Sequence, residues 1–169
     1  LDFAPLPAEL EAPGDFASDV LVEAARAASH VVLPDEDATD LPLVTVDPIG
    51  SRALDPAVHI ARSDNGFLVT YAIADVAAYV RPGSVLDAET LARGETLYFP
   101  DARVPLHPPV LSEGAASLLP GQVRPAVLWQ FTLDHAGEVS EVQVRRARVR
   151  STAQLDDAEL QAALADRTA

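Results

Sequence analysis

The chain has 169 residues, about one domain, and its 49% hydrophobic and 22% charged content suits an ordinary packed core. It has no cysteine, which excludes disulfide frameworks, thiolate zinc sites and cysteine nucleophiles. The formal net charge of −14 argues by itself against a nucleic-acid partner, although binding depends on a local basic patch rather than on the total. The absence of cysteine favours a reducing compartment, and we expect a cytoplasmic protein. No apolar run approaches the roughly 18 residues of a membrane span, so we expect no membrane partner.

Residues 1–40 are predicted to precede the main domain as a lead-in and a helical segment. Residues 1–15 are rich in proline, alanine and glutamate, which is typical of an extended segment. Apolar residues recur at helical spacing over 16–29 and predict a helix there. The acidic stretch LPDEDATDLP then predicts a linker, so that the main domain covers 41–169.

Two hairpins are predicted in the main domain. The first turns at Asn65-Gly66, a dipeptide favoured in tight turns, between two apolar or alternating runs. The second turns at His135–Gly137 and ends in the basic run VRRARVR. Alternation along a strand predicts that the arginines 146, 148 and 150 face solvent, although such a run can also contact phosphates.

Short helices are predicted around the hairpins. Ser84 can cap a helix over Leu86–Arg93 that Gly94 ends. One helical turn is expected near 113–118, and QLDDAELQAALAD has an amphipathic helical pattern. Together these elements predict an α+β fold: a mixed, mainly antiparallel sheet with peripheral helices.

The loop in TVDPIGSRALDPAV carries Asp47 and Asp55 between two apolar runs. Magnesium takes hard oxygen ligands and is often held by one or two carboxylates together with water and substrate phosphate. Two carboxylates that converge from a folded-back loop would suit that ion. The spacing alone favours a simpler interpretation, because Asp-Pro is a common turn former and both aspartates precede proline.

Three longer stretches change that balance. LPLVTVDPIGSRALDPAVHI, YAIADVAAYVRPGSVLDAETLARGETLYFP and RVPLHPPVLSEGAASLLPGQVRPAVLWQFTLDHAGEV resemble, in order and spacing, the catalytic domain of the ribonuclease II family. The resemblance implies processive 3′-to-5′ degradation of single-stranded RNA to nucleoside 5′-monophosphates, with magnesium held by aspartates. It also implies that 41–169 is the first part of a longer domain, incomplete as an enzyme by itself, within a monomeric complete protein.

The chain departs from the family's four-aspartate pattern. The resemblance places the first aspartate at Asp47 and the third at Asp55, as catalytic and metal-binding residues. The second position holds Ala53, which offers no ligand, and the fourth holds Pro56, which offers neither a carboxylate nor a backbone N–H. A two-metal hydrolysis needs ligands for each ion, so the sequence predicts at most one weakly held magnesium.

The resemblance also assigns RNA-binding roles. It places Tyr98 at the catalytic end of the RNA channel, against the alternative of a core tyrosine beside Phe99. Arg93 can face phosphate or only cap the end of its helix. Asp75 is expected to be a buried, hydrogen-bonded structural carboxylate. The four histidines, without metal-ligand spacing, are expected in loops or on the surface.

Three functions therefore stand side by side. The first is a magnesium-dependent 3′-to-5′ exoribonuclease with a reduced acidic cluster. The second is an impaired or inactive RNA-binding relative. The third is an acidic interaction domain without any role in RNA binding.

Overall fold

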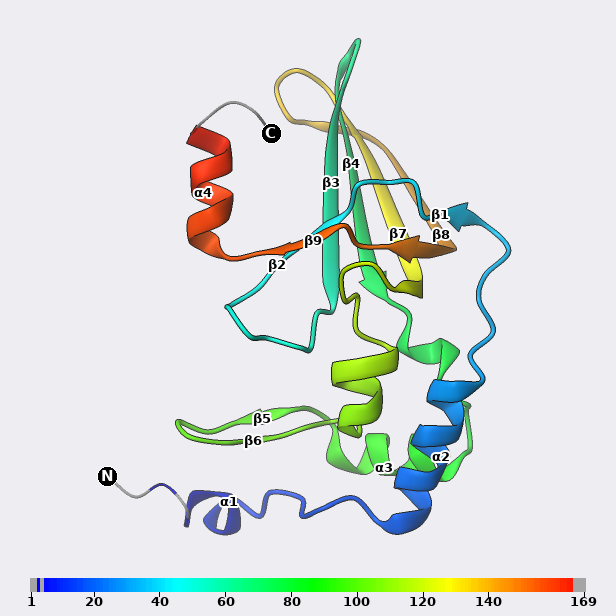
Figure 1. Ribbon diagram of the computed structural model, residues 1–169, viewed down its shortest axis with the longest axis vertical. Coiled ribbons are helices and arrows are strands. Elements are labelled where there is room, and N and C mark those ends of the chain that lie inside the picture. Colours follow the sequence, from blue (N-terminus) through cyan, green and yellow to red (C-terminus); the bar gives the residue numbers. More distant parts are fainter. Residues whose placement is uncertain (1–2, 4, 166–169) are drawn as a thin grey trace.

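A seven-stranded mixed sheet dominates the computed structural model (Figure 1). The structure describes residue 3 and residues 5–165; the remaining residues of the predicted lead-in (1, 2 and 4) and of the predicted domain (166–169) lie outside it. The strand order is β1-β8-β7-β4-β3-β2-β9, and only the β1–β8 and β2–β9 pairs are parallel. The predicted α+β class with a mainly antiparallel sheet is confirmed. The sheet strands are β1 (Asp37–Ala38), β2 (Val44–Val46), β3 (Pro56–Ser63), β4 (Gly66–Ala74), β7 (Val123–Leu133), β8 (Val139–Arg150) and β9 (Ala153–Leu155).

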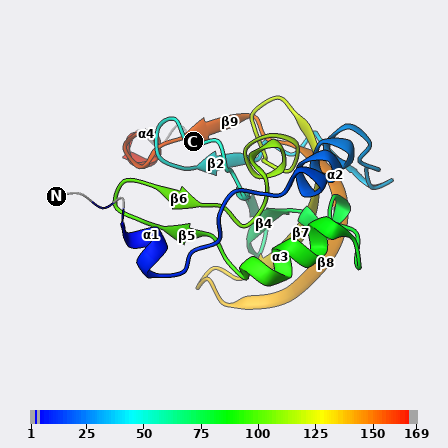
Figure 2. The same ribbon diagram turned by 90° about the horizontal axis from the view of Figure 1, so that it is seen from below.

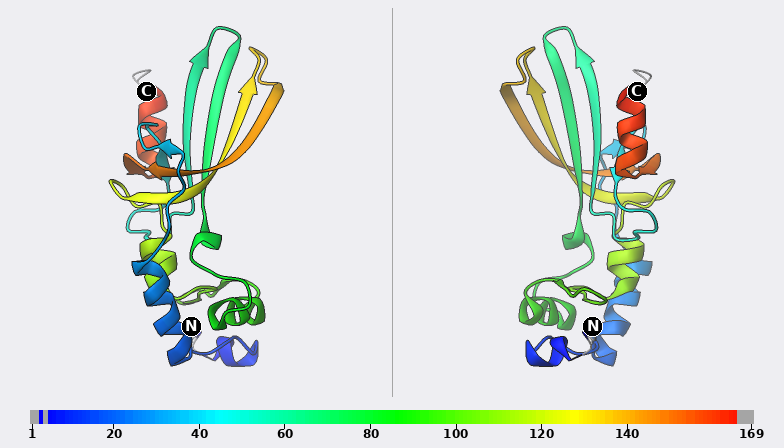
Figure 3. Two further views of the ribbon diagram at one scale, coloured as in Figure 1. Left: turned by 90° about the vertical axis from the view of Figure 1, so that its right-hand side faces the viewer. Right: turned by 90° about the vertical axis from the view of Figure 1, so that its left-hand side faces the viewer.

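The helices gather at the lower end of the long strands, except for α4, which lies beside β2 and β9 (Figures 1 and 3). Seen from below, α1, α3 and a two-stranded β5–β6 ribbon lie at the same end of the molecule (Figure 2). These elements are α1 (Leu6–Glu9), α2 (Ser18–Ser29), η1 (Val76–Ala78), α3 (Val85–Arg93), β5 (Leu97–Tyr98), β6 (Arg103–Val104), the π-helical turn η2 (Leu111–Ala115) and α4 (Asp157–Ala165).

Both predicted hairpins are present. In the first, Asp64 and Asn65 form the turn, and Gly66 opens β4 opposite Ser63. A Cβ atom at Gly66 would lie 2.1 Å from the backbone oxygen of Leu133 on the neighbouring β7, so only glycine fits there. Close approach between hairpins, and not the turn alone, therefore requires this glycine.

The predicted helices are found with small differences. Ser84 caps α3 by accepting a hydrogen bond from the backbone N–H of Asp87 at 3.2 Å, and Gly94 ends it with φ +77°. The expected extended lead-in contains the short α1, and the turn expected near 113–118 is η2, two residues earlier. The terminal helix α4 has no buried residue, so its amphipathic pattern faces no core of the described chain.

Two apolar clusters fill the interior. One lies against the sheet and includes Leu43, Leu118 and Leu128; the other joins α2, α3 and η2 through residues such as Leu86 and Leu111. The segment 111–118 belongs to both clusters and so connects the sheet to the helices.

The opposite sheet face carries apolar side chains in the open. Tyr71 pairs across the strands with Trp129, which pairs with Val144, and all three side chains are exposed. Adjacent exposed apolar side chains of this kind are typical of a contact region. Within the described residues, no helix is long and apolar enough to span a membrane.

Ser117 links the two clusters to the aspartate loop. Its fully buried hydroxyl accepts a hydrogen bond from the backbone N–H of Leu54 at 3.0 Å and donates one to the carbonyl of Arg52 at 2.6 Å. The backbone N–H of Leu118 also donates to the carbonyl of Leu54 at 2.9 Å. These bonds hold the loop on both sides of Ala53.

We expect Ser117→Ala to lower the free energy of unfolding by about 1–3 kcal/mol, because it leaves a buried N–H without its acceptor. Urea denaturation measures this difference. Ser140→Ala removes an exposed hydroxyl that donates to Thr132 on the neighbouring strand, and serves as the matched control. Equal losses in the two variants would contradict the clamping role of Ser117.

Candidate active site

Asp47 and Asp55 lie at the same end of two neighbouring strands. Asp47 follows β2 and its backbone N–H donates to the carbonyl of Leu155 in β9 at 2.9 Å. Asp55 precedes β3 and its carbonyl accepts from the N–H of Ala74 in β4 at 2.8 Å. Because β2 and β3 are antiparallel, the loop between them returns to this end, and Gly50 turns it with φ +82°.

The two carboxylates repel each other. Burial raises the pKa of Asp47, and the charge of Asp55 raises that pKa further. Burial also raises the pKa of Asp55, while nearby His107 lowers it. Among the described residues, the Oδ2 atom of Asp47 is buried without a hydrogen-bond partner. Carboxylates whose charged forms are disfavoured in this way are stabilised by a nearby cation.

Asp55 opens into a cavity of about 330 Å³. Tyr98 reaches this cavity from β5 with 78% of the residue exposed, so it is an open aromatic surface and not a core tyrosine. Ala53 lies at the same cavity, where the resemblance implied a second aspartate. The lining also includes Thr96, Arg103, Leu106, His107, Leu111 and Ser112.

Asp47 faces a different hollow, of about 310 Å³, which it shares with Asp156 and Glu159. These two residues cap the start of α4 reciprocally: each backbone N–H donates to the other side chain, at 3.0 and 2.8 Å. Each of the two side chains therefore already accepts a hydrogen bond at the start of the helix. No group of three or more His, Asp or Glu side chains in the described part of the chain could hold a metal.

The aspartates fit one hard divalent cation but not a pair. One or two carboxylates are enough for magnesium when waters and substrate phosphate complete its shell. A second ion needs further ligands, and Ala53 and Pro56 supply none. The unpartnered oxygen of Asp47 is the observation that supports the single-ion fit.

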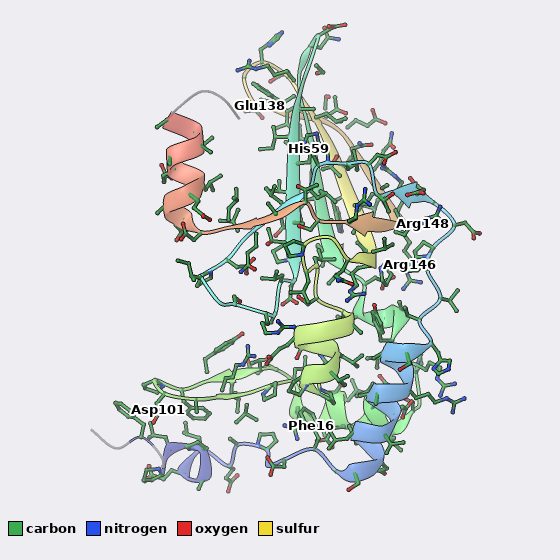
Figure 4. All side chains as sticks on the ribbon, viewed as in Figure 1. Phe16, His59, Asp101, Glu138, Arg146 and Arg148 are labelled. Atoms are coloured by element: carbon green, nitrogen blue, oxygen red, sulfur yellow. The ribbon has the colours of Figure 1, made fainter. Side chains whose placement is uncertain are left out.

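Arg93 is placed away from this cavity. Its side chain is only 3% exposed and its guanidinium donates to Glu89 at 2.7 Å and to the carbonyl of Gly14 at 2.7 Å. The same group lies 3.7 Å from the ring centroid of Phe16, a cation–π contact (Figure 4 labels Phe16). These contacts match neither of the two predicted roles, because the guanidinium holds the segment before α2 and binds no carbonyl at the end of its own helix.

Sequence reasoning missed two residues of the cavity. Arg103 in β6 stands directly across from Tyr98 in β5, and a hairpin signal lies in the Pro100-Asp101 turn between them. His107 is half-buried near Asp55; burial lowers the pKa of its imidazole and the charge of Asp55 raises it. Its position in a loop was expected, but no spacing in the sequence indicates the proximity to Asp55.

The basic run of β8 is largely used for internal ion pairs. Asp75 is buried and its carboxylate binds Arg146 at 2.9 Å, as expected for a structural carboxylate. Arg145 pairs with Glu36 and Arg148 with Asp37, and these two ion pairs tie the predicted linker to the sheet. Three of the four arginines of the run are therefore paired with acidic side chains, and the fourth, Arg150, is exposed.

Fold and site together define a domain with a curved mixed sheet and an acidic loop at one sheet end. The profile of the RNB domain family matches residues 35–169, and the chain belongs to this family of ribonucleases. The boundary predicted at residue 41 stays a prediction.

Three known proteins illustrate the similarity. Ribonuclease R of Acidithiobacillus ferrooxidans is 40% identical over 129 residues, which cover 76% of this chain and 29% of the relative. RNase R of Mycoplasma genitalium, solved in complex with double-stranded RNA, superposes with a TM-score of 0.86 at 26% identity over 99% of this chain and 30% of that one. Yeast Ssd1, a pseudonuclease, shares the fold with a TM-score of 0.70 at 20% identity, over 80% of this chain and 18% of that chain. The chain thus spans less than a third of these proteins, and the fold alone does not decide activity.

We expect Asp47→Asn to stabilise the folded chain at neutral pH, because the ionised carboxylate is desolvated and repelled by Asp55. A raised pKa in the folded state means that ionisation destabilises the fold above that pKa. The advantage of the variant should shrink as pH falls through the raised pKa and vanish below the ordinary value of 3.8. Urea denaturation at several pH values, with exposed Asp101→Asn as control, measures this. A loss of stability at neutral pH in Asp47→Asn would contradict the repulsion.

Proposed function

We propose that the complete protein is a 3′-to-5′ exoribonuclease that hydrolyses single-stranded RNA to nucleoside 5′-monophosphates with the help of magnesium. The observation that carries this proposal is the shared cavity of Asp55 and Tyr98, which come from separate elements. The family and the RNA-bound relative support it.

The residues divide the work between binding and reaction. Tyr98 offers an aromatic face on which a terminal base can stack, a contact worth roughly 1–3 kcal/mol. Asp47 and Asp55 would hold magnesium, whose chemistry when bound is to neutralise charge on the scissile phosphate. Water attacks that phosphorus and loses a proton, the bond to the leaving O3′ breaks and O3′ takes up a proton, and the released nucleotide keeps its 5′-phosphate.

In the proposed complex, the apolar wall of the cavity and the bound nucleotide would together displace water. Ile73, Val76, Leu106 and Leu111 line it beside the polar groups. A drier cavity strengthens the attraction between charged groups, because the local dielectric falls. The wall therefore supports a fixed position for the terminal nucleotide.

A second candidate function is RNA binding without cleavage. The observation that favours it is the neutral pair Ala53 and Pro56, which leaves fewer than three metal-ligating side chains together in the described chain. Under this alternative the cavity holds an RNA end and does not cut it.

The two candidates differ in their response to Ala53→Asp. Because Ala53 lies at the cavity with Asp55, a carboxylate there adds a ligand, and an exoribonuclease should gain about a hundredfold in rate. The assay follows 5′-end-labelled single-stranded RNA on a gel, with magnesium and with a chelator. Intact RNA with both proteins, in the presence of magnesium, would favour the non-cleaving alternative.

Tyr98 tests the binding part separately. We expect Tyr98→Ala to weaken binding of a short single-stranded RNA by about tenfold, whereas Tyr98→Phe should keep most of the affinity, since stacking needs the ring alone. Fluorescence anisotropy in a chelating buffer measures both without cleavage. Equal losses for Ala and Phe would point to the hydroxyl and against stacking.

A further inference from the structure

An RNA end meets an electrostatic obstacle at this cavity. The chain carries a net charge of −14, and the cavity presents the carboxylate of Asp55 to an anionic substrate. A phosphate that enters needs positive charge at close range. Arg93 cannot supply it, because its guanidinium is buried against Glu89, Gly14 and Phe16.

Arg103 is suitably placed. Among the described residues that line the cavity, it is the one lysine or arginine, and its side chain is 39% exposed. It stands directly opposite Tyr98 in the β5–β6 ribbon, and opposite residues of an antiparallel pair project on the same side. An aromatic surface and a guanidinium thus border one cavity side by side.

The present partner of Arg103 is replaceable. Its Nη2 atom contacts the Oε1 atom of Glu113 in η2, and both side chains are partly open to solvent. Exposed ion pairs contribute little to stability, so Arg103 can leave Glu113 at small cost. The planar guanidinium matches phosphate oxygens in a bidentate manner.

We propose that Arg103 binds the phosphate of the nucleotide whose base lies on Tyr98, and that Glu113 competes for it while the cavity is empty. The proposal rests on the proposed function, because it takes the occupant to be the terminal nucleotide of an RNA. It transfers to Arg103 the phosphate contact that the sequence had suggested for Arg93.

The test compares adenosine 5′-monophosphate with adenosine, which lacks the phosphate, by ligand-observed NMR titration of the complete protein in a chelating buffer. Arg103→Gln should lower the affinity for the monophosphate about tenfold, since a charge-assisted contact is lost. The affinity for adenosine should stay unchanged. Glu113→Gln should raise the affinity for the monophosphate several-fold, because Arg103 then loses its competing partner. Arg62→Gln, an exposed arginine near the tip of the β3–β4 hairpin, removes the same charge elsewhere as a control.

We therefore expect the affinity for the monophosphate to fall in Arg103→Gln and to rise in Glu113→Gln. The proposal is overturned if Arg62→Gln lowers the affinity for the monophosphate as much as Arg103→Gln does. It is equally overturned if the unaltered protein binds both ligands alike, or if Glu113→Gln weakens binding. None of these readouts needs cleavage, so an absence of RNA shortening would count against the exoribonuclease alone.

Discussion

The position of the acidic loop depends on one buried hydroxyl. Ser117 holds Leu54 and Arg52 through two hydrogen bonds, and the segment that carries it belongs to both apolar clusters. The packed segment that carries Ser117 thereby fixes the position of the backbone on either side of Ala53. Asp55 follows Leu54 directly, so its position depends on the core together with the turn of the loop at Gly50. This is how a loop of small and turn-forming residues can place a carboxylate reproducibly.

Several arginines of the chain are bound to partners away from the two aspartates, and this shapes the charge around the site. Arg145, Arg146 and Arg148 bind acidic partners along β8, and Arg93 holds the segment before α2. The pKa of each carboxyl, Asp47 and Asp55, is nevertheless raised, although Arg52 lies in the same loop and donates to the carbonyl of Glu113 at 3.3 Å. A bound cation, as proposed for this site, would lower both pKa values. Arg103, paired with Glu113, is the one arginine or lysine among the described residues that line the cavity of Asp55.

The sequence predicted what depends on local pattern. Alternating runs and Asn65-Gly66 predicted the hairpins, Ser84 and Gly94 predicted the limits of α3, and motif resemblance indicated the aspartate loop. Contacts between residues far apart in the chain could not be predicted from the sequence. The burial of Arg93 depends on Gly14 and Phe16, about eighty residues away, and the neighbourhood of His107 and Asp55 depends on how a proline-rich stretch crosses the sheet end. Tertiary packing of this kind leaves no periodic trace in one sequence.

The central claim is that Asp47 and Asp55 together hold one divalent cation. The most direct measurement is a magnesium titration of the complete protein with ¹³C-labelled aspartate, followed through the side-chain carboxyl resonances. The account predicts that Asp47 and Asp55 shift together with one dissociation constant, while Asp101 at the tip of the β5–β6 ribbon stays unchanged (Figure 4). Movement of only one of the two resonances, or of neither, would contradict it.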